Sequence, residues 1–85
     1  MRLELYHKEN CPFSAKVRTF ISSHDLKNQV DYHDIDQDRT TRQDLFRLSH
    51  DEQVPCLVVN GKPMLESEEI IAWLSSHEQE IKQTH

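Results

Sequence analysis

The run PCLVVNGKPML at residues 55–65 constrains the fold more than any other part of the sequence. Residues 55–59 are mainly apolar, which is typical of a buried strand. Asn60 and Gly61 both tolerate positive φ, which a two-residue hairpin turn requires. The segment KPML at 62–65 is then the returning strand. The second half of the chain is therefore predicted to contain an antiparallel strand pair.

The first half of the chain predicts a parallel strand pair. RLELY at 2–6 alternates polar and apolar residues, as a short strand does, and VDYHDI at 30–35 is rich in residues that favour strands. Between them, helical spacing begins at Pro12 and covers about 12–24. A strand–helix–strand unit crosses over with the right hand and makes its two strands parallel.

Two further helices complete the expected order. One spans about 39–49, with Leu45 and Leu48 as its buried contacts, after a polar connection at 34–41. The last helix begins at Ser67 as N-cap, and acidic residues in its first turn favour the helix dipole. Its inward stripe is predicted to be Ile70, Leu74, His77 and Ile81. The order β-α-β-α-β-β-α predicts an α/β fold, in which three helices are distributed over the two faces of a four-stranded mixed sheet. The fold is predicted to form one domain over residues 1–85.

Composition excludes several classes of function. The net charge is −5 and no basic run is present, so the surface that nucleic acid demands is missing. No apolar stretch approaches the roughly 20 residues that span a bilayer. The first ten residues lack a signal-peptide core, so a cytoplasmic, reducing location is expected. The chain is also expected to be a monomer.

The cysteines and histidines do not predict a metal site or a structural disulfide. A structural bridge between Cys11 and Cys56 is not expected in a reducing compartment. The six histidines show no metal-ligand spacing with either cysteine, so no bound metal is predicted; they are His7, His24, His33, His50, His77 and His85.

Cys11 is the candidate nucleophile. It lies where the first helix begins, and the free N–H groups and dipole of a helix start stabilise a thiolate. Lys8, in the same loop, adds positive charge, and both effects lower a thiol pKa. Pro12 and Phe13 would form an apolar rim. The alternative is that Cys11 is a small buried hydrophobic residue, but its polar neighbours favour a reactive thiol.

Ser14 stands where a second cysteine would allow an internal disulfide. A serine cannot form that bond, but its hydroxyl can donate a hydrogen bond to the Cys11 thiolate. A single thiol can attack a mixed disulfide, hold one half of it as a covalent intermediate, and be released from it by a second thiol. Ser14 is therefore predicted to support a monothiol mechanism. The alternative is a solvent-facing residue of the first helical turn.

Four segments carry a resemblance to the glutaredoxins, in the thioredoxin-like fold. They are KENCPFS (8–14), RQDLFRLS (42–49), VPCLVVNGK (54–62) and ES (66–67). The QVP and ES pieces also look like the N-terminal domain of the glutathione S-transferases. The sequence departs from the usual glutaredoxin pattern before the last helix, where MLES replaces a glycine pair. The resemblance implies a glutathione-dependent thiol–disulfide oxidoreductase whose substrates are glutathionylated proteins or small disulfides.

The resemblance also implies a glutathione site, with Phe13 among the residues that line it. Pro55 would be cis, so that the Val54 main chain pairs with the extended tripeptide. Ser67 would receive the γ-glutamyl carboxylate at a helix start, and Glu66 the γ-glutamyl amine. The glycyl carboxylate would bind Lys8 or Arg42, with Arg39 as the reserve; a contact at Gln53, where glutaredoxins usually have Thr, is not expected.

Each of these assignments has a plainer alternative. The Val54-Pro55 bond would be the trans start of a strand, Ser67 a simple N-cap, and the basic residues solvated surface charges. Cys56 follows Pro55, and strand alternation turns neighbouring side chains to opposite faces. Cys56 is therefore expected to be a buried, inert thiol, with a resolving or regulatory role as the alternative.

Other functions stay open at this point. Some one-thiol glutaredoxins carry a [2Fe–2S] cluster between two protomers, ligated by the active-site cysteine and glutathione. Those proteins usually have Gly after the cysteine, and Pro12 disfavours this hypothesis. The chain would alternatively be a non-catalytic binding module like the N-terminal domain of the transferases. Transferase activity on electrophiles ranks lower, because that pocket draws on a helical domain for which 85 residues leave no room.

Overall fold

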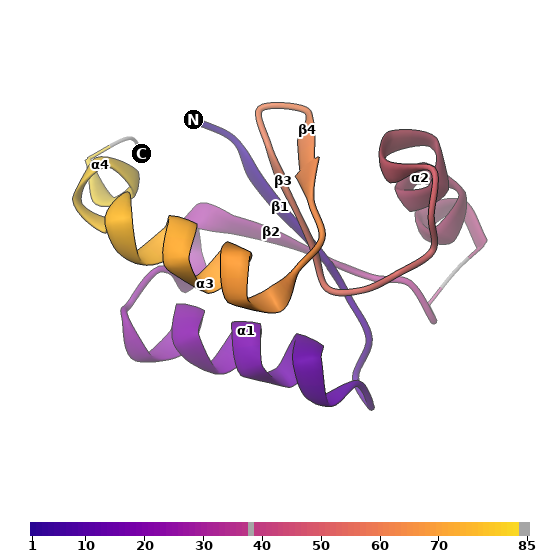
Figure 1. Ribbon diagram of the computed structural model, residues 1–85, viewed down its shortest axis with the longest axis horizontal. Coiled ribbons are helices and arrows are strands. Elements are labelled where there is room, and N and C mark those ends of the chain that lie inside the picture. The colour runs from indigo at the N-terminus through magenta and orange to yellow at the C-terminus, as the bar shows by residue number, and fades with distance from the viewer. Residues whose placement is uncertain (38, 84–85) are drawn as a thin grey trace.

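A computed structural model describes residues 1–37 and 39–83 of the chain. Asp38, in the predicted polar connection, and His85 lie outside the described residues. Figure 1 shows a four-stranded sheet with helices on both faces, which confirms the predicted thioredoxin-like α/β class. The elements are β1 (Leu3–His7), α1 (Pro12–Ser23), the short 3₁₀ turn η1 (Lys27–Gln29), β2 (Val30–Asp34), α2 (Arg39–Ser49), β3 (Cys56–Val59), β4 (Lys62–Met64), α3 (Ser67–Ser76) and α4 (Glu78–Lys82).

The strand order is β2-β1-β3-β4. β1 runs parallel to β2, with Leu3 opposite Val30, as the strand–helix–strand unit predicts. β3 runs antiparallel to β1, with Tyr6 opposite Cys56, and β4 runs antiparallel to β3. This register brings the end of β1, the segment before β3 and the segment after β4 to one end of the sheet.

The Asn60-Gly61 hairpin forms as predicted. Asn60 has φ 49° and Gly61 has φ 88°, the positive values that a tight hairpin turn needs. The Asn60 side-chain oxygen also accepts a hydrogen bond from the Arg2 N–H at 2.8 Å, and the Asn60 N–H donates to the Arg2 carbonyl at 3.0 Å. These bonds tie the turn to the start of the chain.

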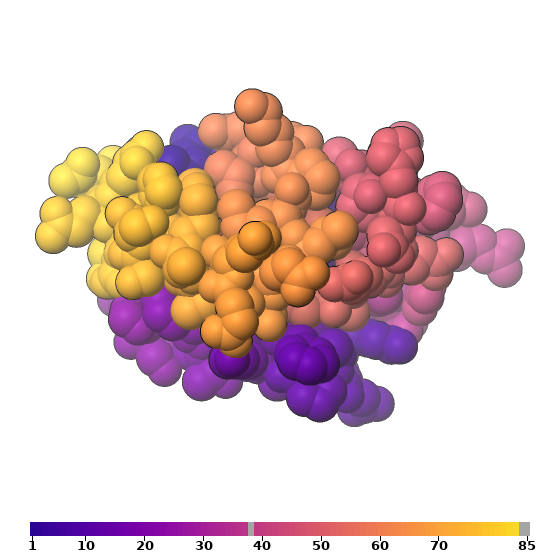
Figure 2. Space-filling view, viewed as in Figure 1, coloured from indigo at the N-terminus to yellow at the C-terminus, as the bar shows by residue number. Residues whose placement is uncertain are grey.

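The sheet separates two hydrophobic cores. Alternate side chains of each strand point to opposite faces, so Leu5 and Leu57 enter one core while Tyr6 and Cys56 enter the other. The larger core is covered by α1 and α3, which lie side by side in Figure 1, and their surfaces meet in Figure 2. Its buried members are Leu3, Leu5, Val17, Ile21, Leu26, Val30, Leu57, Ile70, Leu74 and Ile81.

The smaller core lies under α2. Its buried members are Tyr6, Ile35, Leu45, Cys56 and Val58, and α2 itself contributes only Leu45 as a fully buried residue. Leu48, the other predicted contact, is partly buried against this core. Truncating a residue such as Leu45 to Ala leaves a cavity and costs about 2–5 kcal/mol of stability.

Two details of the last helix differ from the sequence prediction. Glu66 is the N-cap and Ser67 is the first helical residue, so the predicted cap is one position too late. The helix also breaks at His77, which has φ −113° and ψ 13°, and α4 follows. The His77 ring stacks on Trp73 at 4.2 Å, and its Nδ1 lies 2.8 Å from the Trp73 carbonyl oxygen. His77 is therefore half-buried at the break and not a regular member of the inward stripe, whereas Ile70, Leu74 and Ile81 are buried as predicted.

Candidate active site

Cys11 is the N-cap of α1 and follows the loop that leaves β1. Its backbone is extended, with φ −95° and ψ 119°, and its carbonyl accepts the first helical hydrogen bond from the Ala15 N–H at 2.9 Å. Pro12 occupies the first helical position, where its missing N–H removes no hydrogen bond. No side chain caps this helix start, so the N–H groups of the first turn face the Cys11 sulfur.

The Cys11 pKa is lower than that of an ordinary thiol. Burial opposes ionisation, but the backbone N–H and the hydroxyl of Ser14, the N–H of Phe13 and the charge of Lys8 together outweigh it. The sulfur is partly exposed, and the protonated thiol points at the Val54 carbonyl oxygen 4.0 Å away. A partly exposed sulfur with a stabilised thiolate has the two properties that a nucleophile needs.

Ser14 is fully buried, so it is not a solvent-facing residue of the first turn. Its hydroxyl oxygen accepts a hydrogen bond from the Lys8 N–H at 3.3 Å. The same hydroxyl donates to the Cys11 sulfur and lowers the Cys11 pKa. Ser14 therefore connects the loop before the helix to the sulfur.

A groove of about 280 Å³ opens beside Cys11. It forms because the antiparallel pairing of β1, β3 and β4 brings the segments around residues 13, 54 and 66 to the same end of the sheet. Its lining contains five of the predicted glutathione residues and two others; the full set is Phe13, Gln53, Val54, Pro55, Leu65, Glu66 and Ser67. Gln53 thus lies in the groove although no contact was expected there.

The groove has a polar backbone side and an apolar rim. The Val54-Pro55 peptide bond is cis, as the family resemblance implied. Phe13 is 60% exposed, so its ring stands at the rim as predicted. Ser67 opens α3, and an N–H group in the first turn of a helix can receive an anion. The groove therefore brings together a cis peptide bond, an aromatic rim and the start of a helix.

The basic residues predicted for the glycyl carboxylate lie outside this groove. Arg42 on α2 makes two ion pairs, each of 2.9 Å, with Asp36 and Glu52. Arg39 and Arg42 line a separate cleft of about 420 Å³ beside the exposed ring of Phe46. Lys8 acts on Cys11 directly, because its positive charge helps to lower the Cys11 pKa.

Cys56 has the environment that strand alternation predicts. It lies on β3 with no exposed surface, in the core under α2. Burial raises its pKa to about 11, against a small opposing effect of a backbone hydrogen bond with Met64. Both cysteines are free. At neutral pH the Cys56 thiol is therefore protonated and inaccessible.

Arg18, beside the site, has no role in the sequence interpretation. Arg18 donates hydrogen bonds to the ring of His7 and to the carbonyl oxygens of Lys8 and Glu9, so it holds the loop that precedes Cys11. A signal for Arg18 exists in the sequence: it lies four residues after Ser14 and seven after Cys11, on the same face of the helix.

Within residues 1–37 and 39–83, no group of three or more His, Cys, Asp or Glu side chains has the arrangement of a metal site. None of the helices in this part of the chain has the length and apolar character needed to cross a bilayer.

Comparisons with known proteins connect this fold and site to one family. The glutaredoxin family model matches residues 3–64. Prostaglandin E synthase 2 of Danio rerio is 31% identical over 88 residues, which cover 98% of this chain but only 22% of the relative. The chain thus spans about a fifth of the length of that curated relative.

Two crystal structures illustrate the shared fold. Oxidised glutaredoxin 2 from Chlamydomonas reinhardtii has a TM-score of 0.69 at 16% identity, with 96% of this chain and 79% of that chain covered. A glutathione transferase homologue from Sulfitobacter with bound glutathione has a TM-score of 0.74 at 15% identity, with 95% of this chain and 39% of that chain covered. These structural matches establish the thioredoxin-like fold, and the match of the family model establishes that the chain belongs to the glutaredoxin family.

Proposed function

We propose that the chain is a glutathione-dependent thiol–disulfide oxidoreductase that acts on glutathione mixed disulfides by a monothiol mechanism. One observation carries the proposal: the Cys11 sulfur, whose pKa the first turn of α1 lowers, lies 4.0 Å from the Val54 carbonyl oxygen at the edge of the groove. Membership of the glutaredoxin family supports the same reaction class. Cys11 and Ser14 are the proposed catalytic residues.

The reaction has two exchange steps. The Cys11 thiolate attacks the glutathionyl sulfur of the mixed disulfide, which breaks the S–S bond and releases the substrate thiolate. A disulfide between Cys11 and glutathione remains. A second glutathione, as thiolate, attacks the glutathionyl sulfur of this intermediate, so that glutathione disulfide leaves and the Cys11 thiolate returns. The low pKa of Cys11 favours both its attack and its departure.

The groove supplies the proposed glutathione site. The Val54 main chain would pair with the extended tripeptide, as an added strand pairs with a sheet edge. The N–H and hydroxyl of Ser67 would hold the γ-glutamyl carboxylate, and Glu66 the γ-glutamyl amine. The Sulfitobacter homologue binds glutathione on the same fold, which supports a glutathione site in this chain.

Lys8, Arg42 and Arg39 are the proposed partners of the glycyl carboxylate. The two carboxylates that hold Arg42 are largely exposed, and exposed ion pairs of this kind contribute about 0–1 kcal/mol. Arg42 can therefore exchange one of them for a ligand carboxylate at little cost. Lys8 lies in the loop beside Cys11, at the edge of the proposed site.

The experiment is a turnover assay with a glutathionylated peptide and glutathione, in which the release of glutathione disulfide is measured for wild type, Cys11→Ser and Cys56→Ala. We expect turnover in wild type and in Cys56→Ala, and only the uncatalysed rate in Cys11→Ser. Mass spectrometry of wild type with glutathione disulfide should show one glutathionyl group, on Cys11. Wild type that does not exceed the uncatalysed rate would overturn the proposal.

A further inference from the structure

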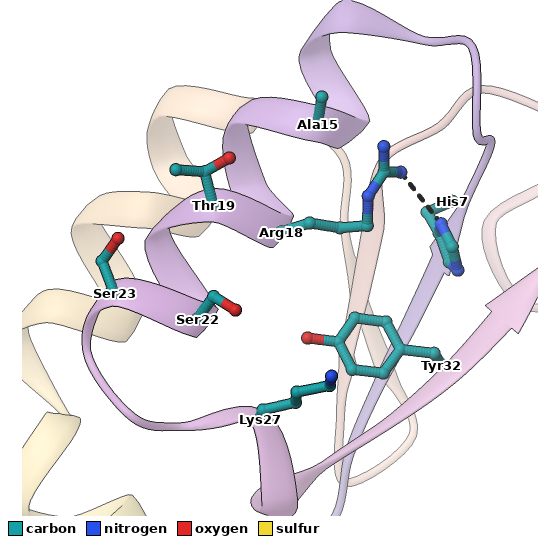
Figure 3. A pocket seen from close by; sticks show the side chains of 8 residues that line it. All are labelled: His7, Ala15, Arg18, Thr19, Ser22, Ser23, Lys27 and Tyr32. Atoms are coloured by element: carbon teal, nitrogen blue, oxygen red, sulfur yellow. Dashed lines mark hydrogen bonds between the residues drawn. The ribbon is translucent and has the colours of Figure 1, made fainter.

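A third cleft, of about 480 Å³, lies between α1 and β2 on the larger-core side of the sheet (Figure 3). Arg18 projects from α1 into this cleft and points toward His7 at the end of β1. Lys27 and Tyr32 also line the cleft. None of these residues belongs to the glutathione groove.

The donors of Arg18 are directed at the backbone of the active-site loop. Nη1 lies 3.0 Å from the Lys8 carbonyl oxygen and 3.0 Å from His7 Nδ1, and Nη2 lies 3.2 Å from the Glu9 carbonyl oxygen. A planar guanidinium can bridge several acceptors in one rigid arrangement, whereas an ammonium group cannot. Arg18 therefore fixes two consecutive carbonyl groups and a ring nitrogen relative to α1.

The fixed loop touches Cys11 by two routes. The Lys8 carbonyl that accepts from Arg18 also accepts the Cys11 N–H at 3.3 Å. The Lys8 N–H donates to the Ser14 hydroxyl oxygen at 3.3 Å, and that hydroxyl in turn donates to the Cys11 sulfur. The Lys8–Glu9 segment thus accepts hydrogen bonds from Arg18 through its carbonyl groups and donates one to Ser14 through the Lys8 N–H.

His7 is suited to its place in this arrangement. It is 7% exposed, and burial, then the charge of Arg18, lowers its pKa, so the ring is neutral at pH 7 and Nδ1 can accept from Arg18. The His7 and Tyr32 rings pack in a T-shaped arrangement, with ring centroids 5.6 Å apart and an interplanar angle of 82°, which fixes the His7 ring from the β2 side.

We infer that Arg18 is a positioning residue for the proposed reaction, which holds the Lys8–Glu9 backbone so that Ser14 and Lys8 stabilise the Cys11 thiolate. Without this contact the first-turn N–H groups of α1 remain, but the Ser14 hydroxyl loses its fixed partner and the Lys8 charge loses its fixed position. The effect of Arg18 on Cys11 is therefore partial and is transmitted through the loop. This inference rests on the proposed function, because it assigns Arg18 a role in that reaction. Its test measures the reactivity of Cys11 and does not require turnover.

The test measures the pH dependence of Cys11 alkylation by iodoacetamide in Arg18→Met, Arg18→Lys and wild type. Arg18→Met keeps the apolar stem and removes the donors, and we expect alkylation at pH 6.5 to slow by about three- to tenfold, which corresponds to a pKa rise of about half to one unit. Arg18→Lys keeps the charge but cannot reach three acceptors together, so we expect it to slow alkylation relative to wild type as well.

Lys27→Met is the matched control, because it removes a cation from the same cleft and none of the loop contacts. It should leave the alkylation profile unchanged. Circular dichroism establishes which variants are folded, and if Arg18→Met does not fold, Arg18→Lys decides. A wild-type alkylation profile in the folded Arg18 variants, or an equal shift in Lys27→Met, would overturn the inference. A shifted profile in a protein without turnover would support the inference while the proposed function fails.

Discussion

Cys11 lies at the open start of α1, whereas Cys56 lies on β3 inside the core under α2. Burial opposes ionisation at both sulfurs. At Cys11 the donors of Ser14 and Phe13 and the charge of Lys8 outweigh that effect, and at Cys56 a single backbone hydrogen bond does not. The comparison shows that the depth of burial of a sulfur and the donors around it together decide which thiol is reactive.

The strongest test of this comparison is selective alkylation of the folded wild type at pH 7. We expect iodoacetamide to modify Cys11 at least about a hundredfold faster than Cys56, because the Cys56 pKa is about 11 and its side chain is fully buried. Peptide mass spectrometry after timed quenching measures the two rates. Similar rates in the folded protein would remove the distinction, and equal rates in urea serve as the control for intrinsic reactivity.

The next test is the stability of the protein in alkaline solution. Between pH 9 and 11 the Cys56 thiol ionises in the unfolded state but keeps its proton in the folded state, so the free energy of unfolding falls as the pH rises. This contribution amounts to about 2–3 kcal/mol across that window. Denaturant unfolding of wild type and Cys56→Ala should show a steeper alkaline loss in wild type.

Cys56→Ala removes this group and leaves the other alkaline groups in place, among them Tyr6, whose pKa burial raises. The difference between the two curves therefore isolates Cys56. Parallel curves through this window would mean that Cys56 ionises equally in both states.

A smaller effect is expected for Ser14→Ala. This change removes the donor to the Cys11 thiolate and the acceptor for the Lys8 N–H. We expect the alkylation rate of Cys11 at pH 6.5 to fall by about threefold and the free energy of unfolding to fall by about 1 kcal/mol. Ser23→Ala, exposed on the same helix, is the control. An unchanged Cys11 rate would leave Ser14 with a structural role alone.

The smallest effect concerns the groove. Glu66→Gln removes the proposed partner of the γ-glutamyl amine, and we expect the KM for glutathione to rise by about threefold with kcat unchanged. Glu68→Gln is the control, because Glu68 pairs with Lys16 and does not line the groove. A KM that responds equally to both changes would indicate a general charge effect at the start of α3.

The sequence predicts the elements of this fold well, because each depends on local patterns. The Asn60-Gly61 turn, the alternation in β1 and the helical spacing after Pro12 all lead to the observed sheet and helices. The break at His77 is not visible in the pattern, since the apolar spacing continues through it to the buried Ile81. The stacking of His77 on Trp73 accompanies the break, and only the folded chain shows it.

The site divides in a similar way. The chemistry of Cys11 follows from its position at a helix start, and the burial of Cys56 follows from strand alternation. The role of Arg18 depends on which loop carbonyls its guanidinium reaches, and the two ion pairs of Arg42 depend on how the ends of α2 are placed. Long polar side chains have many rotamers, so local sequence cannot specify such contacts.

The unequal size of the two cores has a consequence for motion. α2 contributes one fully buried residue, Leu45, and none of its residues lines the groove beside Cys11. A helix anchored by so little apolar surface detaches at a lower free energy than the whole domain unfolds. Amide hydrogens of α2 should therefore exchange with deuterium before those of α1.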